Sequence, residues 1–137
     1  MADSNRIQYI TIASTGNSTD FGDLLSTYHD HAGCSNSTRG VFGYKTTSTS
    51  VNVLEYITIA STGNSADFGD YDTHKNDTAA VASTIRGVFG GGAVSGGTTN
   101  NIEFITIDTL GNTTDFGDLT AATEDLTGAS SNHGGIA

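Results

Sequence analysis

The chain contains no proline and no tryptophan, and Cys34 is its one cysteine. A single cysteine cannot form an internal disulfide, so the sequence does not fit the small secreted domains that depend on several such bridges. Only five of the 137 residues are Lys or Arg, against fifteen Asp or Glu, and the net charge is -10. This balance provides no basic surface for a polyanion, so we expect no nucleic-acid partner.

Long apolar segments are also missing. No segment approaches the roughly 18 apolar residues of a membrane-spanning helix, so we expect no membrane partner. Residues 1–6 are polar and lead directly into a patterned segment, so we predict no signal peptide. Ser, Thr, Gly and Asn make up close to half of the chain. Any hydrophobic core must therefore be thin and distributed along the chain.

The dominant feature of the sequence is one unit written three times. Its first block is YITIASTGNSTDFGD, which returns once almost unchanged and once as FITIDTLGNTTDFGD. The three copies begin at Tyr9, Tyr56 and Phe104, spaced 47 and 48 residues apart. A second block, RGVFG, begins at Arg39 and Arg86, and the same register places GGIA of residues 134–137 in its third copy. Such a period is typical of repeat architectures.

Each unit is predicted to form four short β-strands. In the first unit β-branched and aromatic residues fill Ile7–Ala13, and Gly and Asn mark a turn after it. The other expected strands of this unit are Asp20–Leu24, Ala32–Ser35 and Arg39–Gly43. Residues 90–101 are rich in glycine, and we expect them to form a flexible link. The chain is therefore predicted to be all-β.

This order of strands resembles the repeats of kelch-type β-propellers. Val88 and Phe89 run into a glycine pair, a variable loop follows, and Ile102–Ile107 provides the next strand. Phe116 stands where kelch repeats carry a tryptophan. The resemblance implies a propeller built from three four-stranded blades of about 47 residues per chain.

On this resemblance, the chain is a single repeat domain of residues 1–137 with four parts. The half blade 1–24 supplies strands 3 and 4, residues 25–71 and 72–119 form complete blades, and the half blade 120–137 supplies strands 1 and 2. Three blades do not close a ring, because propellers hold about four to eight. We therefore expect closure by a homo-oligomer, with a dimer of six blades favoured. The alternative is a closed β-trefoil or β-prism monomer.

The repeat unit is also similar to tandem repeats in tail-associated proteins of marine and cyanobacterial phages, through its ITIASTGN and DFGDL strings. This similarity implies a non-catalytic structural or binding role in a virion, with attachment to a host surface or a glycan. The alternative function is a small lectin of the trefoil or prism type with three carbohydrate sites. We predict no enzymatic activity and no cofactor, because no nucleophile or acid–base pair recurs among the units.

The DFGD strings supply the candidate metal ligands. Their carboxylates are Asp20 and Asp23, Asp67 and Asp70, and Asp115 and Asp118. Carboxylate pairs suit calcium, which prefers several oxygen ligands. The favoured interpretation is structural, because an aspartate at a strand entrance accepts hydrogen bonds from turn amides and three equivalent copies indicate repeat construction.

Residues that differ between the units are the candidate ligand contacts. The segments around Tyr28, Tyr44 and Tyr71 vary, and tyrosine among Ser, Gly and Asn is typical of adaptable binding loops. Arg39 and Arg86 precede the VFG strand in two units. We expect these arginines either to pair with DFGD carboxylates of a neighbouring unit or to meet a ligand.

Overall fold

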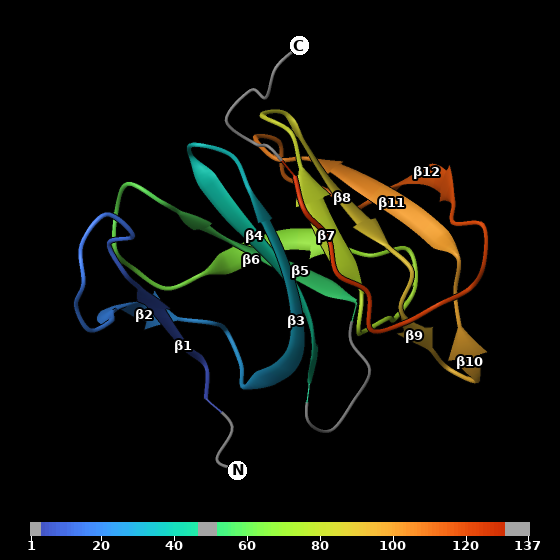
Figure 1. The fold of residues 1–137 in the computed structure, drawn as a ribbon, viewed down its shortest axis with the longest axis horizontal. Coiled ribbons are helices and arrows are strands. Elements are labelled where there is room, and N and C mark those ends of the chain that lie inside the picture. The colour runs from blue at the N-terminus through green and yellow to red at the C-terminus, as the bar shows by residue number, and fades with distance from the viewer. Residues whose placement is uncertain (1–3, 47–51, 131–137) are drawn as a thin grey trace.

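The computed structural model describes residues 4–46 and 52–130, without the side chains of residues 29 and 44–46 (Figure 1). The described part of the chain contains strands and no helix, which confirms the all-β prediction. The strands are β1 (Arg6–Tyr9), β2 (Thr19–Asp23), β3 (Tyr28–Ser35), β4 (Arg39–Thr46), β5 (Val53–Thr58), β6 (Ala66–Asp70), β7 (Ala79–Ala82), β8 (Arg86–Gly90), β9 (Ala93–Val94), β10 (Gly97–Thr98), β11 (Asn101–Thr106) and β12 (Thr114–Asp118).

The strands form several antiparallel sheets. β1 pairs with β2 in a two-stranded sheet, on the left in Figure 1. β3, β4, β5 and β6 lie side by side in chain order as a four-stranded sheet. β7, β8, β11 and β12 form a second four-stranded sheet, with the small β9–β10 hairpin inserted between β8 and β11. Each four-stranded sheet thus contains one RGVFG block and the DFGD block that follows it.

One irregularity of pairing occurs in all three DFGD strands. The register shifts by one residue in each hairpin, so that one phenylalanine of each DFGD strand faces no partner residue on the neighbouring strand. These residues are Phe21, Phe68 and Phe116. The glycine that follows each of them has a φ of +155°, +148° or +141°. An extra residue of this kind is a β-bulge, which bends the strand and changes the direction of the bulged side chain. The DFGD string therefore encodes a β-bulge.

Two expectations about strand boundaries need correction. The strand expected over Ile7–Ala13 ends at Tyr9, because Ser14 N–H donates to Thr11 O (3.2 Å) and closes a turn. The glycine-rich segment of residues 90–101 is not an unstructured link, because β9 and β10 pair inside it. Neither change affects the order of the repeats along the chain.

The main hydrophobic core joins the two four-stranded sheets. Its buried members are Ala32, Val41, Leu54, Phe68, Tyr71, Phe89, Ile105 and Ile107. Cys34 of β3 packs against this core, and burial raises the pKa of its thiol to about 12. A Cβ at Gly87 of β8 would lie 2.5 Å from Cys34 Sγ. A side chain at position 87 would therefore require Cys34 to move, so the two sheets are in close contact at this point.

Candidate functional site

The hairpins β1–β2, β5–β6 and β11–β12 carry the DFGD block of the first, second and third repeat. Each hairpin is connected to the next by the same set of hydrogen bonds, which we call the joint. In the first joint the outer edge of β2 meets the turn between β5 and β6. Gly63 N–H donates to Phe21 O (2.8 Å), and Ser65 N–H donates to Asp23 O (2.9 Å). Asp23 N–H in turn donates to Asn64 Oδ1 (3.0 Å). The bulged strand of one repeat is thereby paired with the turn of the next.

The second joint repeats these bonds between β6 and the turn that connects β11 to β12. Gly111 N–H donates to Phe68 O (2.9 Å), and Thr113 N–H donates to Asp70 O (2.8 Å). Asp70 N–H donates to Asn112 Oδ1 (3.1 Å). Because donors, acceptors and register all agree, the joint is a property of the repeat and not of one place in the chain.

The bulge glycines permit the close approach of the two repeats. A Cβ at Gly22 would lie 2.1 Å from Gly63 O in the first joint, and one at Gly69 would lie 2.3 Å from Gly111 O in the second. Real Cβ atoms do not come so close to a carbonyl oxygen. Gly117 of the third repeat has the same kind of backbone, yet nothing lies within 4 Å of its Cβ position. The third repeat therefore has the shape of a joint without its neighbour.

A buried carboxylate lies beneath the first joint. Glu55 is fully buried and accepts hydrogen bonds from Leu25 N–H (3.1 Å) and Tyr28 Oη (3.1 Å). The hydroxyl of Ser65, a joint residue, also donates to Glu55. A buried charge is tolerated only when such donors surround it. Glu55 therefore binds the segment after β2 to the sheet of the next repeat.

Glu103 occupies the same position beneath the second joint. It accepts hydrogen bonds from Asn101 Nδ2 (2.9 Å), Thr113 Oγ1 (2.7 Å) and Asp72 N–H (3.4 Å). The ammonium of Lys75 forms an ion pair with it at 3.1 Å, and both side chains are buried. Burial lowers the pKa of Lys75, and the charge of Glu103 opposes that shift.

The two halves of a joint are left open at the two ends of the chain. Within the part of the chain that the structure describes, no turn of a further repeat donates to Phe116 O or Asp118 O or accepts from Asp118 N–H, the β12 groups that correspond to those used in the two joints. The complementary groups are Gly16 N–H, Asn17 Oδ1 and Ser18 N–H in the first turn, and these too have no recorded partner there. One end therefore carries the strand half of the joint, and the other carries the turn half.

The bulged phenylalanines are buried in the two joints and exposed at the open end. Phe21 and Phe68 are 9% and 2% exposed, whereas Phe116 is 54% exposed. Each packs edge-on against an aromatic ring of its own hairpin at a centroid distance of 6.0–6.2 Å. The internal contact is thus intact in all three copies. Among the described residues, no turn of a further repeat covers Phe116 as the later turns cover Phe21 and Phe68.

The isoleucines at the start of the three turns differ in their exposed fraction. Ile12 is 93% exposed, Ile59 is 43% exposed and Ile107 is fully buried. Ile107 packs against a complete four-stranded sheet, Ile59 faces only the two-stranded β1–β2 sheet, and Ile12 has no preceding repeat. Exposure therefore falls step by step as more of the preceding repeat is present.

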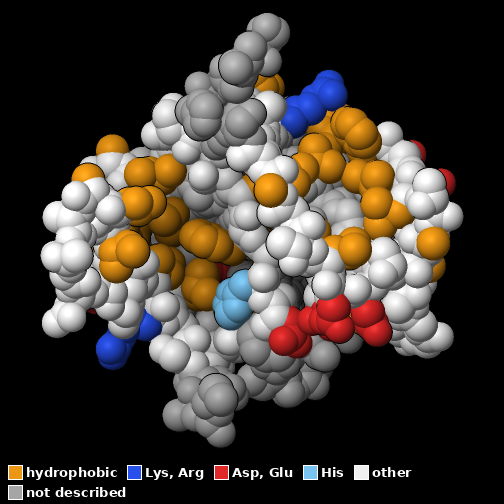
Figure 2. Space-filling view, in the orientation of Figure 1, with side chains coloured by type: hydrophobic (Ala, Val, Ile, Leu, Met, Phe, Trp, Pro, Cys, Tyr) orange, Lys and Arg blue, Asp and Glu red, His pale blue; other side chains and the backbone are white. Residues whose placement is uncertain are grey.

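An apolar groove of about 540 Å³ lies between the β1–β2 hairpin and strands β4 and β5. Figure 2 shows hydrophobic side chains gathered around a hollow on this side of the molecule. Its apolar walls include Ile7, Tyr9, Phe21, Phe42, Ile57 and Ile59. Among the described residues β1 pairs only with β2, whereas its counterparts β5 and β11 each have a second neighbouring strand. Among the described residues, the groove therefore lies beside a strand with one unpaired edge.

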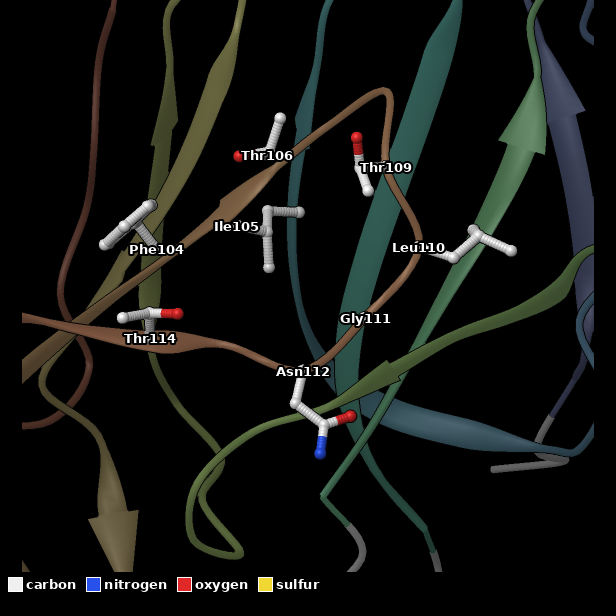
Figure 3. Close-up of a pocket in the computed structure, with 8 residues that line it drawn as sticks. All are labelled: Phe104, Ile105, Thr106, Thr109, Leu110, Gly111, Asn112 and Thr114. Carbon is white, nitrogen blue, oxygen red and sulfur yellow. The ribbon is translucent and has the colours of Figure 1, made fainter.

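A second cavity, of about 190 Å³, lies within the β11–β12 hairpin (Figure 3). Phe104 and Thr114 come from the facing strands, and Leu110 and Asn112 come from the turn. Its lining contains no titratable side chain. The volume is below the roughly 300 Å³ of typical ligand pockets. This cavity is the inner side of a hairpin turn.

The predicted ligand-binding tyrosines lie inside the molecule. Tyr28 is 9% exposed, and its hydroxyl donates to Glu55. Tyr71 is 2% exposed, and its ring packs edge-on against Phe89 at 5.3 Å. The side chain of Tyr44 is outside the described residues. The structure therefore places Tyr28 and Tyr71 among packing contacts, and it brings neither to a surface loop.

The two predicted arginines lie over aromatic rings. Arg39 is 4.8 Å from the ring centre of Tyr56, and its guanidinium donates to Ile107 O (3.0 Å). Arg86 is 4.6 Å from the ring centre of Phe104. In the described part of the chain, neither arginine forms an ion pair with a DFGD carboxylate. A guanidinium over a ring forms a stabilising cation–π contact. Arg39 and Arg86 each form such a contact, with equivalent rings of two repeats.

Turns of all three repeats meet at one corner. Asn36 donates to Asp108 Oδ1 (3.0 Å) and to Thr84 O (3.3 Å), and Thr38 Oγ1 also donates to Asp108 Oδ1 (2.9 Å). The hydrogen bonds from Asn36 and Thr38, with a smaller effect of Arg39, hold the pKa of Asp108 below its usual value. This corner stabilises the arrangement of the repeats.

The DFGD aspartates do not converge on one point. Asp20, Asp67 and Asp115 are exposed, and Asp23 and Asp70 use their backbone groups in the joints. Over residues 4–46 and 52–130, no group of three or more His, Cys, Asp or Glu side chains is arranged to hold a metal ion. The side chains that cap backbone amides at the joints are the asparagines of the turns.

Sequence reasoning missed the buried polar residues. Glu55, Glu103 and Lys75 were not candidates, although all three are buried at the joints. A signal was present, because Gln8, Glu55 and Glu103 share one register position inside apolar strands. A charged residue repeated at such a position indicates a buried hydrogen-bonded site.

No protein-family profile matches this chain, and no curated protein matches it. The described residues contain no helix that is long and apolar enough to cross a membrane. The features that bear on function are the joint, its buried carboxylates and its two open halves.

Proposed function

We propose that this chain is a non-catalytic structural module that assembles with copies of itself, and that its sheets act as blades of a kelch-like β-propeller. The observation that carries this proposal is the joint, which is made twice within the chain and is open at both ends. Unpaired strand edges and exposed apolar side chains favour association. A homodimer with six blades is the simplest closed form.

The order of the strands supports this arrangement. Each four-stranded sheet is an antiparallel meander, which is the construction of a propeller blade. β1 and β2 correspond in sequence to the last two strands of such a sheet. By register, residues 120–137 correspond to its first two strands, but residues 120–130 contain no strand in the single chain and residues 131–137 are outside the described residues. In a homo-oligomer the two segments would complete one sheet between chains.

The biological setting stays a prediction from the resemblance of the repeats. A virion or tail-associated role, with attachment to a host surface or a glycan, is compatible with a self-assembling module. The alternative function is a trefoil or prism lectin, which would act as a monomer with three carbohydrate sites. The buried positions of Tyr28 and Tyr71 support a glycan site in neither of the two functions.

The test is the mass of the wild-type protein in solution, measured by light scattering on a sizing column. One chain has a mass of 14.1 kDa. Self-assembly predicts an integral multiple of this mass, and the six-bladed ring predicts twice this value. A stable species with the mass of one chain would contradict the proposal, and a screen for glycan binding would then be the next step.

A further inference from the structure

We infer that two copies of this chain meet through a third instance of the joint, in which the β12 edge of one copy receives residues 10–18 of the next. This inference rests on the proposed self-assembly and goes further by naming both surfaces. It makes the contact head-to-tail, because the strand half and the turn half are different parts of the chain.

The hydrogen-bonding groups of the two ends are complementary. Gly16 N–H would donate to Phe116 O, as Gly63 does to Phe21 in the first joint. Ser18 N–H would donate to Asp118 O, and Asp118 N–H would donate to Asn17 Oδ1. Each of these pairs has two internal precedents with the same atoms. No change of backbone register is needed.

The apolar surfaces of the two ends are complementary as well. Phe116 is 54% exposed on the strand half, and Ile10 and Ile12 are 61% and 93% exposed on the turn half. Their counterparts in the second joint are Phe68, Ile105 and Ile107, and none of these is more than 2% exposed. Forming the third joint would therefore bury side chains that the repeat buries wherever it is complete.

The space at the open end is suitable for this contact. Nothing lies within 4 Å of the Cβ position of Gly117, whereas the same position at Gly22 and Gly69 is filled by a carbonyl oxygen of the next repeat. All three glycines have a positive φ, which favours glycine by itself, and at Gly22 and Gly69 the missing side chain also makes room for the next backbone. In the third repeat that backbone would be Gly16 of the next copy.

Gln8 is the counterpart, in the third joint, of the buried carboxylates Glu55 and Glu103. Gln8 stands in the register of Glu55 and Glu103, and its side chain is oriented by Ser18 Oγ, which donates to Gln8 Oε1 (2.7 Å). Ser65 and Thr113 make the same contact in the internal joints. In the third joint the amide oxygen of Gln8 would accept from Thr120 N–H of the other copy, as Glu55 accepts from Leu25 N–H.

Two substitutions test the two halves of the contact one at a time. Ile12→Ser removes the turn half and Phe116→Ser removes the strand half, and both side chains are largely exposed in the single chain. Ile85→Ser is the matched control, because Ile85 is 63% exposed and lies outside both halves. Far-UV circular dichroism verifies that each variant keeps its β-structure. The readout is the mass by light scattering.

We expect Ile12→Ser and Phe116→Ser each to have the mass of one chain, and Ile85→Ser to assemble as the wild type does. An equimolar mixture of the first two variants should regain a species of two chains. Each variant retains the half that the other lacks, so one intact joint forms per pair.

The outcomes distinguish this inference from the proposal on which it rests. A wild type with the mass of one chain overturns both. A wild type that assembles while Ile12→Ser or Phe116→Ser still assembles overturns only the third joint. If both variants are single chains but their mixture shows no pair, the contact is not head-to-tail and the inference is also wrong.

Discussion

Glu55 and Glu103 stand at the same position in two repeats and are fully buried, whereas Gln8 stands at that position in the first repeat and is exposed. The difference follows from what covers each residue. The segment after β2 covers Glu55, and the segment that carries Lys75 covers Glu103. A carboxylate is retained where backbone and side-chain donors surround it, because an unpaired buried charge is costly.

The first prediction concerns the ion pair beneath the second joint. Glu103→Gln removes the carboxylate that pairs with the buried ammonium of Lys75 and leaves only the weaker interaction with Asp72, so we expect the free energy of unfolding to fall by about 3 kcal/mol. Urea unfolding at neutral pH measures this change. The burial-lowered pKa of Lys75 lets the side chain lose its proton, which limits the loss.

The control for this prediction removes both charges. Lys75→Met combined with Glu103→Gln keeps the approximate volume, and such replacement of a buried ion pair is often nearly neutral. We therefore expect the double variant to regain most of the stability that Glu103→Gln loses. If Glu103→Gln alone is as stable as the wild type, the pair is not a structural element of the joint.

At the scale of the element, the DFGD strand and the turn of the next repeat form one unit. The bulge turns Phe68 into the core and presents its carbonyl to Gly111 N–H. Glycine at position 69 allows the turn to approach within van der Waals distance of the strand. The element therefore depends on a partner that is distant in sequence.

The strands could be predicted from the sequence, but the joint could not. β-branched residues and turn signals locate the strands near Ile7, Phe21 and Val41 because these preferences are local. The end of β1 at Tyr9 and the buried position of Tyr28 depend on contacts between repeats. Variation between units pointed to Tyr28 and Tyr71 as ligand contacts in loops, whereas Tyr28 donates to Glu55 and Tyr71 packs against Phe89.

The second prediction compares two glycines with the same backbone. Gly69→Ala places a methyl group 2.3 Å from Gly111 O, whereas Gly117→Ala meets nothing in the single chain. Both have a similar positive φ, so the cost of backbone strain is shared. In the single-chain background Ile12→Ser, we expect Gly69→Ala to cost about 2 kcal/mol more in unfolding free energy. Equal costs would show that the second joint is not tightly packed.

At the scale of the whole molecule, the described residues form a repeat array whose packing differs along its length. The core is best developed where two complete sheets meet, around Val41 and Phe89. It is open at the groove beside β1–β2 and absent at Ile12 and Phe116. Repeats that contact only their neighbours expose apolar surface at both ends unless these ends are capped or joined.

The most direct test of the account is amide hydrogen exchange at Gly16 and Ser18 in the wild-type protein. Their counterparts Gly63 and Ser65 donate to β2 within the chain, so they should exchange slowly. We predict that Gly16 and Ser18 exchange as slowly as these two in the wild type, and rapidly in Ile12→Ser. Rapid exchange at Gly16 and Ser18 of the wild type, with Gly63 and Ser65 still protected, would contradict a third joint between chains.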